Sequence, residues 1–501
     1  MALTIPVAEI VSKTKNPLLW KHKSWKRVLL GEIATVLNGY AFKSAKFSRG
    51  KGTPLIRIRD VCKDSTNTNY EGEFDEKYIV DKGDLLIGMD GDFHSGRWRG
   101  PKGLLNQRVC KVVLETEDFL ISFLEYLLPG YLKAINDVTS SVTVKHLSSQ
   151  TIKEIPLPFP SVVEQKRIVA EIEKQFSRLD EAVDNLKRIK ANLKRYKASV
   201  LKAAVEGKLT KEWRKANPDV EPAGKLLKRI LVERRKKWEA AELAKIKAKG
   251  KEPKDDRWKK KYKEADSLSA GWVHELPENW CLSNVAQLAS QKQNSVSSGP
   301  FGSNLGTKDY VESGIPVIRG KNIQAGQILL KDFVYITEKK AEEIKRSIAC
   351  PGDVVIIAVG SSGRPGIIPT ELDRVILSQN CNKVTCDISI ILPEFLNLCL
   401  QTDFMQEQIS GKTTDTVRKF FSLTNFKQIV VPLPPIQEQR EILEITDVQI
   451  SNIDRLEAQV DVNRKRSDRL RQSILKKAFS GKLVPQVNED ESPANSQKQT
   501  A

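Results

Sequence analysis

Cysteine and histidine are scarce in this chain of 501 residues, and their spacing argues against a structural metal site. None of the seven cysteines stands in a C-x-x-C pair, and the four histidines do not cluster with them. Zinc sites are built from closely spaced ligands of these types, so no metal is expected. An odd number of scattered cysteines is typical of a reducing compartment.

Long apolar runs are also missing. A membrane-spanning helix needs about eighteen or more consecutive apolar residues, and no such stretch occurs. The first 24 residues lack the apolar core of a signal peptide. The sequence therefore predicts a soluble, cytoplasmic protein without a membrane partner.

Catalytic motifs are missing as well. A methyltransferase acting on amino groups of nucleic acids would carry an Asn/Asp-Pro-Pro-aromatic loop, whereas the nearest string, residues 433–436, reads Leu-Pro-Pro-Ile. A phosphate-binding loop ending at residues 411–413 would need glycine where Gln406 stands. Asp90 and Asp92 are a candidate metal pair, although carboxylates in a Gly-rich loop more often form a turn. We expect a noncatalytic chain that binds no cofactor itself.

Positive charge, in contrast, is abundant. The chain has 82 Lys and Arg against 63 Asp and Glu, a net charge of +19 and a pI near 9.4. So large an excess favours a polyanion as the partner, and double-stranded DNA is the first candidate.

One stretch occurs twice. Residues 158–209 and 432–483 align without a gap at an offset of 274, as Gly207 and Gly481 illustrate. Proline precedes each copy, and these glycines stand where a C-cap would, so each copy is predicted to be one long helix. The predicted heptad seam consists of Leu179, Ala182, Leu186, Ile189, Leu193, Tyr196 and Val200 in the first copy and Ile453, Leu456, Val460, Asn463, Ser467, Leu470 and Ile474 in the second.

The two predicted helices are each other's best partner, because neither has enough apolar surface to be stable alone. We expect an antiparallel coiled coil, a rod on the order of 65 Å long at about 1.5 Å per residue. Antiparallel pairing would carry the segments before the helices to opposite ends of the rod. Two unrelated surface helices are the alternative.

The expected fold class is α/β, with mixed α+β domains, two long helices and a pseudo-twofold internal repeat. The predicted parts are an N-terminal extension (1–24), a first recognition domain (25–155), a first spacer helix (156–209), a charged and partly helical linker (210–274), a second recognition domain (275–431), a second spacer helix (432–484) and a disordered tail (485–501).

The two domains share framework strings but not the loops between them. The matching strings are Gly52–Arg57 with Gly314–Arg319, Lys82–Ile87 with Pro351–Ile356, and Leu105–Gln107 with Leu377–Gln379. A common scaffold with different loops is what two readers of different short sequences would need.

Reading a DNA duplex requires Lys and Arg for phosphates and Arg, Asn or Gln for base edges. Aromatic residues near such loops support them or pack in the core. The candidate DNA-binding residues are Tyr40, Phe42, Lys43, Arg57, Arg59, His94, Arg97, Arg99, Gln107 and Arg108 in the first domain, and Phe301, Ser303, Arg319, Lys321, Asn322, Ser361, Ser362, Arg364, Gln379 and Asn380 in the second.

The linker is unusually basic. Residues 211–266 contain 20 Lys and Arg against 11 Asp and Glu, and residues 226–249 have helical composition. A solvated spacer and nonspecific contact with DNA phosphates are both open interpretations.

As a whole, the layout resembles the specificity subunit of type I restriction-modification systems. The resemblance covers nearly the entire chain and rests on the domain openings Trp25–Ala34 and Leu276–Trp280 and on the spacer strings Pro432–Gln439 and Ile474–Leu483. The long charged linker is a departure that some subfamilies share.

The resemblance implies a DNA target of two half-sites separated by a nonspecific gap. It implies two methyltransferase subunits that bind S-adenosylmethionine and methylate adenine at N6, and restriction subunits that use ATP and Mg to translocate and cut DNA. Two other classes stay open: a coiled-coil scaffold that binds only proteins, and a self-contained methyltransferase or nuclease.

Overall fold

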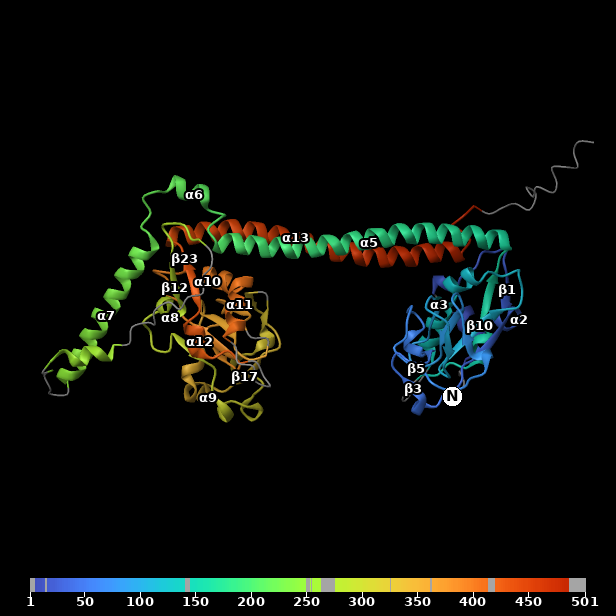
Figure 1. Ribbon diagram of the computed structural model, residues 1–501, viewed down its shortest axis with the longest axis horizontal. Coiled ribbons are helices and arrows are strands. Elements are labelled where there is room, and N and C mark those ends of the chain that lie inside the picture. The colour runs from blue at the N-terminus through green and yellow to red at the C-terminus, as the bar shows by residue number, and fades with distance from the viewer. Residues whose placement is uncertain are drawn as a thin grey trace, which may run out of the picture. The chain divides into compact units, whose positions relative to one another are not determined.

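The computed structural model describes residues 5–13, 16–139, 145–248, 253, 255–262, 275–324, 326–360, 363–412 and 420–485. The predicted tail, apart from its first residue, lies outside this part of the chain. The protein forms two compact units: unit 1 combines residues 1–188 with 460–501, and unit 2 spans residues 189–459. Each unit holds one mixed domain and part of both long helices, α5 (Val162–Val205) and α13 (Ile436–Phe479) (Figure 1).

The domain of unit 1 is built on two sheets and one separate strand pair. β1 (Lys26–Leu29) pairs with β11 (Pro156–Phe159) in antiparallel register. One sheet has the order β2 (Ala34–Asn38), β10 (Val109–Leu114), β7 (Leu85–Gly88), β8 (His94–Arg97). The other has the order β3 (Phe47–Ser48), β5 (Asn69–Tyr70), β4 (Thr53–Ile56), β9 (Gly103–Leu105), β6 (Ile79–Val80), with β4 and β9 parallel.

The helices of this domain are α1 (Val7–Lys13), α2 (Leu30–Ile33), α3 (Ile121–Val138) and α4 (Ser149–Lys153). The apolar face of α3, including Phe123, Leu127 and Tyr131, is buried in the main core with residues of the first sheet and with the end of α13 at Phe479. These apolar residues recur with the helical period, so one face of α3 packs in the core and holds the domain against the end of α13.

The domain of unit 2 repeats this plan. β12 (Cys281–Asn284) pairs with β23 (Val430–Leu433). One sheet has the order β13 (Val296–Ser298), β22 (Cys381–Val384), β19 (Val354–Ile357), β20 (Pro365–Ile367), β16 (Gly326–Ile328), β15 (Ile323–Gln324). The other has the order β17 (Val334–Ile336), β14 (Ile315–Ile318), β21 (Val375–Leu377), β18 (Ile348–Ala349). The helices are α8 (Val285–Leu288), α9 (Glu338–Glu343), α10 (Pro393–Leu400), α11 (Asp403–Gly411) and α12 (Leu423–Lys427).

The strand orders confirm the predicted fold class and internal repeat. The order β2-β10-β7-β8 in unit 1 corresponds to β13-β22-β19-β20 in unit 2, and the parallel pair β4/β9 corresponds to β14/β21. Even a partly buried ion pair is repeated: Lys111 Nζ lies 3.1 Å from Asp84 and Lys383 Nζ lies 2.7 Å from Asp353. The framework strings therefore contain or adjoin equivalent strands of one scaffold that occurs twice.

Each long helix begins against its own domain through one glutamine. Gln165 Oε1 accepts the N–H of Leu120 at 2.8 Å, and Gln439 Oε1 accepts that of Leu392 at 2.8 Å. Each helix also ends at a left-handed glycine, Gly207 with φ +69° and Gly481 with φ +68°. These C-caps stop the helices where the sequence predicts.

The two helices run antiparallel in both units. In unit 1 the early part of α5 pairs with the late part of α13, where Asp180 accepts a hydrogen bond from Arg471. In unit 2 the late part of α5 pairs with the early part of α13, where Lys197 Nζ lies 2.8 Å from Asp454. The offset of 274 relates these two ion pairs to each other.

The structure corrects one half of the predicted seam. Four positions spaced by seven face inward in each helix: Leu179, Leu186, Leu193 and Val200 in α5, and Ile453, Val460, Ser467 and Ile474 in α13. Four of the alternate predicted positions are turned outward, with exposed fractions of 46% for Ile189, 53% for Tyr196, 49% for Leu456 and 42% for Leu470, whereas Asn463 is only partly exposed.

At most of these turns the second seam position lies one residue later, at partly buried residues such as Val183, Lys197, Glu457 and Arg471. The exception is Arg464, which is exposed. The predicted seam advances by three residues and then by four, whereas the observed seam advances by four and then by three. Apolar residues alone did not distinguish these two registers. Long charged side chains occupy the inner position because their stems cover apolar surface while their charged ends reach water.

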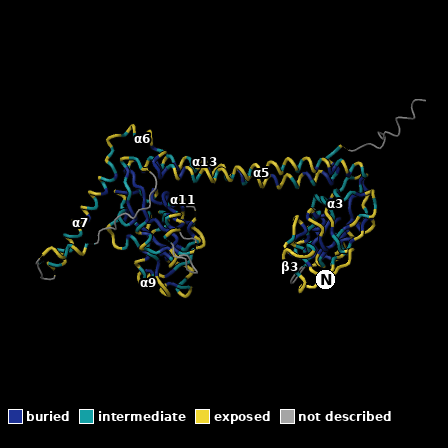
Figure 2. The backbone as a smooth tube through the Cα atoms, in the orientation of Figure 1, coloured by how far each residue is buried: buried dark blue, intermediate teal, exposed yellow. Residues whose placement is uncertain are grey.

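The linker is largely helical in its described part, with α6 (Lys211–Ala216) and α7 (Ala223–Ala248), followed by the 3-10 helix η5 (Asp256–Lys261). Among the described residues, no helix is long and apolar enough to cross a membrane. Figure 2 shows that buried backbone is concentrated inside the two domains, whereas much of α7 is exposed.

Candidate nucleic-acid interface

The ends of six strands meet on one side of the unit 1 domain, here called loop face 1: the ends of β2, β4, β7 and β9 and the starts of β8 and β10. Backbone hydrogen bonds join these ends, such as Tyr40 N–H to Leu105 O at 2.9 Å and Met89 N–H to Arg108 O at 3.0 Å. Loops that leave a rigid sheet together are the usual place for binding residues.

A short turn positions the arginines of loop face 1. After β4 the chain forms η3 (Ile58–Asp60), and the buried carboxylate of Asp60 accepts the N–H of Arg57 at 3.1 Å. Arg59 donates to Thr68 Oγ1 at 3.1 Å. Local capping of this kind holds a turn in one conformation.

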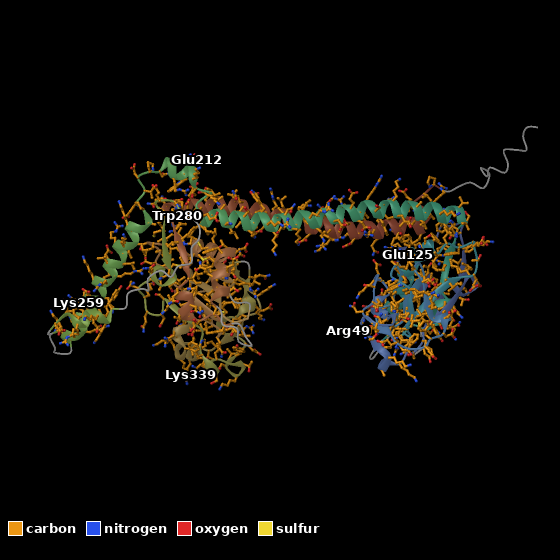
Figure 3. All side chains as sticks on the ribbon, viewed as in Figure 1. Arg49, Glu125, Glu212, Lys259, Trp280 and Lys339 are labelled. Carbon is orange, nitrogen blue, oxygen red and sulfur yellow. The ribbon has the colours of Figure 1, made fainter. Side chains whose placement is uncertain are left out.

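The two predicted arginines line an open hollow of about 570 Å³ together with Phe47, Ser48, Arg49, Asp60, Lys63, Asn67 and Thr68. Arg49 and Lys63 were not predicted; the only signal was their basic character beside the Gly50–Gly52 turn and the 3-10 turn. Four cations around one hollow make a surface suited to phosphate oxygens. Figure 3 shows Arg49 on the side of the domain away from α5 and α13.

His94 supports loop face 1 instead of presenting a free ring. Its Nδ1 lies 2.7 Å from Asp92 O and its Nε2 lies 3.0 Å from Ile58 O. The ring therefore lies between two backbone carbonyls, one of them in the arginine turn, and a neutral imidazole donates to one of the two. His94, a candidate DNA-binding residue from the sequence, therefore has a positioning role in the loop.

Of the two predicted aromatic residues here, one is exposed and one is buried. Tyr40 is 51% exposed, and its ring lies at a centroid distance of 5.2 Å from that of Phe42, edge-on, and 5.2 Å from that of Tyr78, tilted by 34°. Phe42 is 7% exposed in a cluster with Leu55 and others, so the structure corrects it to a core residue. Lys43 and Gln107 are exposed nearby, and the Gln107 N–H donates to Tyr40 O at 2.9 Å.

Arg108 belongs to loop face 1, whereas Arg97 and Arg99 do not. Arg108 is half exposed and lies 2.6 Å from Asp90, which also binds His146 at 2.6 Å. Asp90 is thus used in ion pairing. In the β7–β8 hairpin, His94 pairs with Gly88 and Arg97 with Leu85, so Arg97 is at the opposite end.

Arg97 and Arg99 both lie 3.9 Å from the carboxylate of Glu125 on α3. Burial raises the pKa of Glu125, and the two arginines oppose that shift. Figure 3 shows Glu125 on the side of the domain near the long helices. The sequence could not separate these arginines from the others, because strand direction decides which hairpin end carries them.

Loop face 2 is formed by the corresponding strand ends of unit 2. Arg319 follows β14 and opens η8 (Gly320–Asn322), where Asn322 Oδ1 accepts the Arg319 N–H at 3.1 Å. Asn322 is 1% exposed and its Nδ2 donates to Lys331 O at 2.9 Å, so it is the equivalent of Asp60 and not a base reader. Arg319 donates to Asp332 O at 2.8 Å, and Lys321 is exposed.

The remaining residues of loop face 2 divide into support and surface. Gln379 donates to Leu305 O at 2.9 Å and to Gly302 O, so it holds the loop that carries Phe301, which is 72% exposed. Ser303, Arg364 and Asn380 are exposed. Ser361 and Ser362 lie outside the described residues.

Two glycines that the prediction missed bring the loops together. A Cβ on Gly39 would lie 2.1 Å from Asn106 O, and one on Gly299 would lie 1.8 Å from Ser378 O. Only glycine allows the end of β2 or β13 to approach the neighbouring loop this closely. A glycine at the end of each predicted first strand was the available signal.

The described residues do not gather into a metal or nucleophile site. No group of three or more His, Cys, Asp and Glu in that part of the chain is arranged to hold a metal ion. Burial raises the pKa of Cys110 and of Cys381 to about 12, so both thiols are protonated and unreactive at neutral pH. The chemistry offered by the two loop faces is hydrogen bonding and charge.

Comparison with known proteins agrees with this geometry. The model of the type I restriction modification DNA specificity domain matches residues 22–195 and 279–462. The chain is 34% identical over 482 residues to the type I restriction enzyme EcoBI specificity subunit of Escherichia coli, covering 95% of this chain and 90% of that protein. It is 23% identical over 496 residues to the EcoKI specificity subunit of E. coli strain K12, covering 93% and 90%.

A solved structure described as the structural basis underlying complex assembly and conformational transition of the type I R-M system has the same fold. Its TM-score is 0.61 at 15% sequence identity, and the match covers 92% of this chain and 99% of that one.

Duplicated scaffolds with differing basic loop faces define a DNA sequence-recognition protein. The chain belongs to the family of type I restriction-modification specificity subunits, as the predicted resemblance indicates.

Proposed function

We propose that this chain is the noncatalytic specificity subunit of a type I restriction-modification complex and that each loop face reads one half of a bipartite DNA target. Two methyltransferase subunits, which would bind S-adenosylmethionine, methylate adenine N6 at the sites it selects. Restriction subunits would supply ATP- and Mg-dependent cleavage.

The observation that carries this proposal is one scaffold with two different sets of exposed side chains. Arg57 and Arg319 occupy equivalent positions after equivalent strands, and both turns are capped by a buried side chain. The exposed aromatic residue, however, is Tyr40 on one face and Phe301 on the other. Because the two domains share one strand scaffold but expose different side chains, this comparison supports the reading of two different half-sites.

The long helices supply a surface for protein partners. Ile189, Tyr196 and Leu456, all in unit 2, are exposed by 46%, 53% and 49%. Residues 182, 189 and 196 are spaced by seven and so hold the same heptad position on α5. The offset of 274 makes residue 456 of α13 the equivalent of residue 182, so Leu456 holds this heptad position too and lies on the same side as Ile189 and Tyr196. Exposed apolar residues in a row support docking of the methyltransferase subunits.

A domain exchange tests the proposal. Residues 25–155 are replaced by the matching domain of a related specificity subunit, and methylated adenines are mapped across the genome of a host that expresses the complex. One half-site is expected to change while the other stays the same. A change in both half-sites, or methyl transfer by the purified chain alone, would refute the proposal.

The gap between half-sites gives a second test. Four residues inserted in both long helices lengthen each by about 6 Å. The tolerated gap in the mapped target is expected to change, because the helices would act as the spacer. An unchanged gap would remove the spacer role while leaving the two half-sites in place.

A further inference from the structure

The basic linker has a built structure that a solvated spacer does not need. The first half of α7 is anchored on the unit 2 domain: Ala223 and Leu227 are buried in its main core. Arg234, 5% exposed, donates to Gln287 O at 2.7 Å and to Asp387 at 2.8 Å. A buried and doubly bonded arginine fixes the direction in which the helix leaves the domain.

Beyond Arg234 the helix continues to Ala248, about 21 Å at 1.5 Å per residue. The 3-10 helix η5 packs back on it through three aromatic rings. The rings of Trp238 and Trp258 stack at a centroid distance of 6.3 Å and an interplanar angle of 23°, and the ring of Tyr262 lies 5.3 Å from that of Trp238. This contact makes residues 235–248 and 255–262 one folded element, here called the arm.

The charge of the arm is not neutralised within it. Its described residues include nine Lys and Arg and four Asp and Glu. Each acidic residue is paired with one cation: Arg235 with Glu239, Lys245 with Glu242, Arg257 with Asp255 and Lys259 with Asp256. The remaining cations are exposed lysines with no ion pair to the described residues: Lys236, Lys237, Lys247, Lys260 and Lys261.

We propose that the arm binds the phosphate backbone of double-stranded DNA outside the recognition sequence. Lysines on flexible stems suit phosphates but lack the planar fork that reads a base edge, so the contact would be independent of sequence. The two tryptophans stack on each other, which argues against a platform for unpaired bases. The idea rests on the proposed function in one respect, that the chain is bound to DNA when the arm acts.

The test is the salt dependence of binding by the full chain to a nonspecific duplex. In the variant, Lys236, Lys237, Lys260 and Lys261 are each replaced by Gln. Each lost phosphate contact reduces the magnitude of the slope of log K against log salt by about 0.9. Loss of contacts from at least two of the four lysines is expected, which reduces the magnitude by at least about 1.8. Circular dichroism checks that α7 stays folded.

A matched control uses the anchored end of the same helix. Lys225→Gln with Lys228→Gln removes two exposed lysines before Arg234 and is expected to leave the slope unchanged. The pair Lys236→Gln with Lys237→Gln removes the same charge from the arm and is expected to lower it. Trp238→Ala keeps every charge but releases η5, and an intermediate slope is expected.

Two results would overturn the proposal. Equal slopes for the arm variant and the unaltered chain would make the arm a solvated spacer. Equal slopes combined with loss of copurifying methyltransferase subunits would assign the arm to an acidic protein partner. Because the duplex carries no target, these readouts do not depend on bipartite recognition, which the genome map of methylated adenines tests separately.

Discussion

Trp280 donates its indole Nε1–H to Oε2 of Glu438 over 2.9 Å, and Trp25 makes the same bond to Glu164, also over 2.9 Å. The other carboxylate oxygen distinguishes the two sites. Oε1 of Glu438 accepts from Thr210 at 2.7 Å and from Arg214 at 2.5 Å. Oε1 of Glu164 is buried and has no hydrogen-bond partner among the residues that the structure describes.

Glu438→Gln is expected to destabilise unit 2 by about 3 kcal/mol, because it turns an amide towards two donors and leaves Arg214 without its buried counter-charge. Glu164→Gln is the matched control and is expected to stay within about 0.5 kcal/mol, since its amide replaces an unpaired oxygen. Calorimetry of the full chain measures both. Equal losses would show that the Thr210 and Arg214 contacts contribute nothing.

Gly39→Ala and Gly299→Ala should each disturb one loop face, because the new Cβ would lie within 2.1 Å and 1.8 Å of a backbone oxygen. Each variant is expected to lose recognition of one half-site and to keep recognition of the other. Methylation of the target is expected to fall, with at least tenfold weaker DNA binding. Gly306→Ala is the control for loop face 2, since no atom of the described residues lies within 4 Å of the Cβ that the alanine would add. Normal binding by Gly299→Ala would contradict the close approach.

Arg57→Ala is expected to weaken DNA binding by about 1–3 kcal/mol, the usual range for one arginine that contacts a base or phosphate in the bound state. Arg99→Ala removes the same charge at a side chain that is 70% exposed beside Glu125, and less than a twofold change is expected. Electrophoretic mobility shifts of the assembled complex compare them. A larger effect at Arg99 would move the interface to the other end of the hairpin.

Much of the framework was open to prediction because it depends on spacing. The offset of 274, the glycines at 207 and 481 and the repeated strand strings describe backbone geometry, which tolerates few residue types. The seam was only half predictable. Ile189 and Tyr196 are apolar yet exposed, and apolar character alone does not separate a helix-facing residue from a partner-facing one.

The site was harder to predict because burial decides the role of a polar residue. Asn322 was a candidate DNA-binding residue in the sequence, but it is a buried cap of an arginine turn, as Asp60 is in the other domain. His94 was a candidate DNA-binding residue in the sequence, but its ring lies between two backbone carbonyls, Asp92 O and Ile58 O. Such roles follow from contacts distant in sequence, which a residue pattern does not contain.

The corrected seam makes a prediction that separates stability from assembly. Leu193 faces inward, whereas Tyr196, one turn away on the same helix, is 53% exposed. Leu193→Ala is expected to lower the free energy of unfolding by about 1–2 kcal/mol through loss of buried apolar surface. Tyr196→Ala is expected to change it by less than about 0.5 kcal/mol.

Tyr196→Ala should instead weaken binding of the methyltransferase subunits, because the lost ring belongs to the exposed row that the proposed function assigns to them. Copurification of the complex at matched expression measures this, and urea unfolding of the free chain measures stability. If Tyr196→Ala destabilised the chain as much as Leu193→Ala, the tyrosine would belong to the helix interface, and the outward orientation of this row would be wrong.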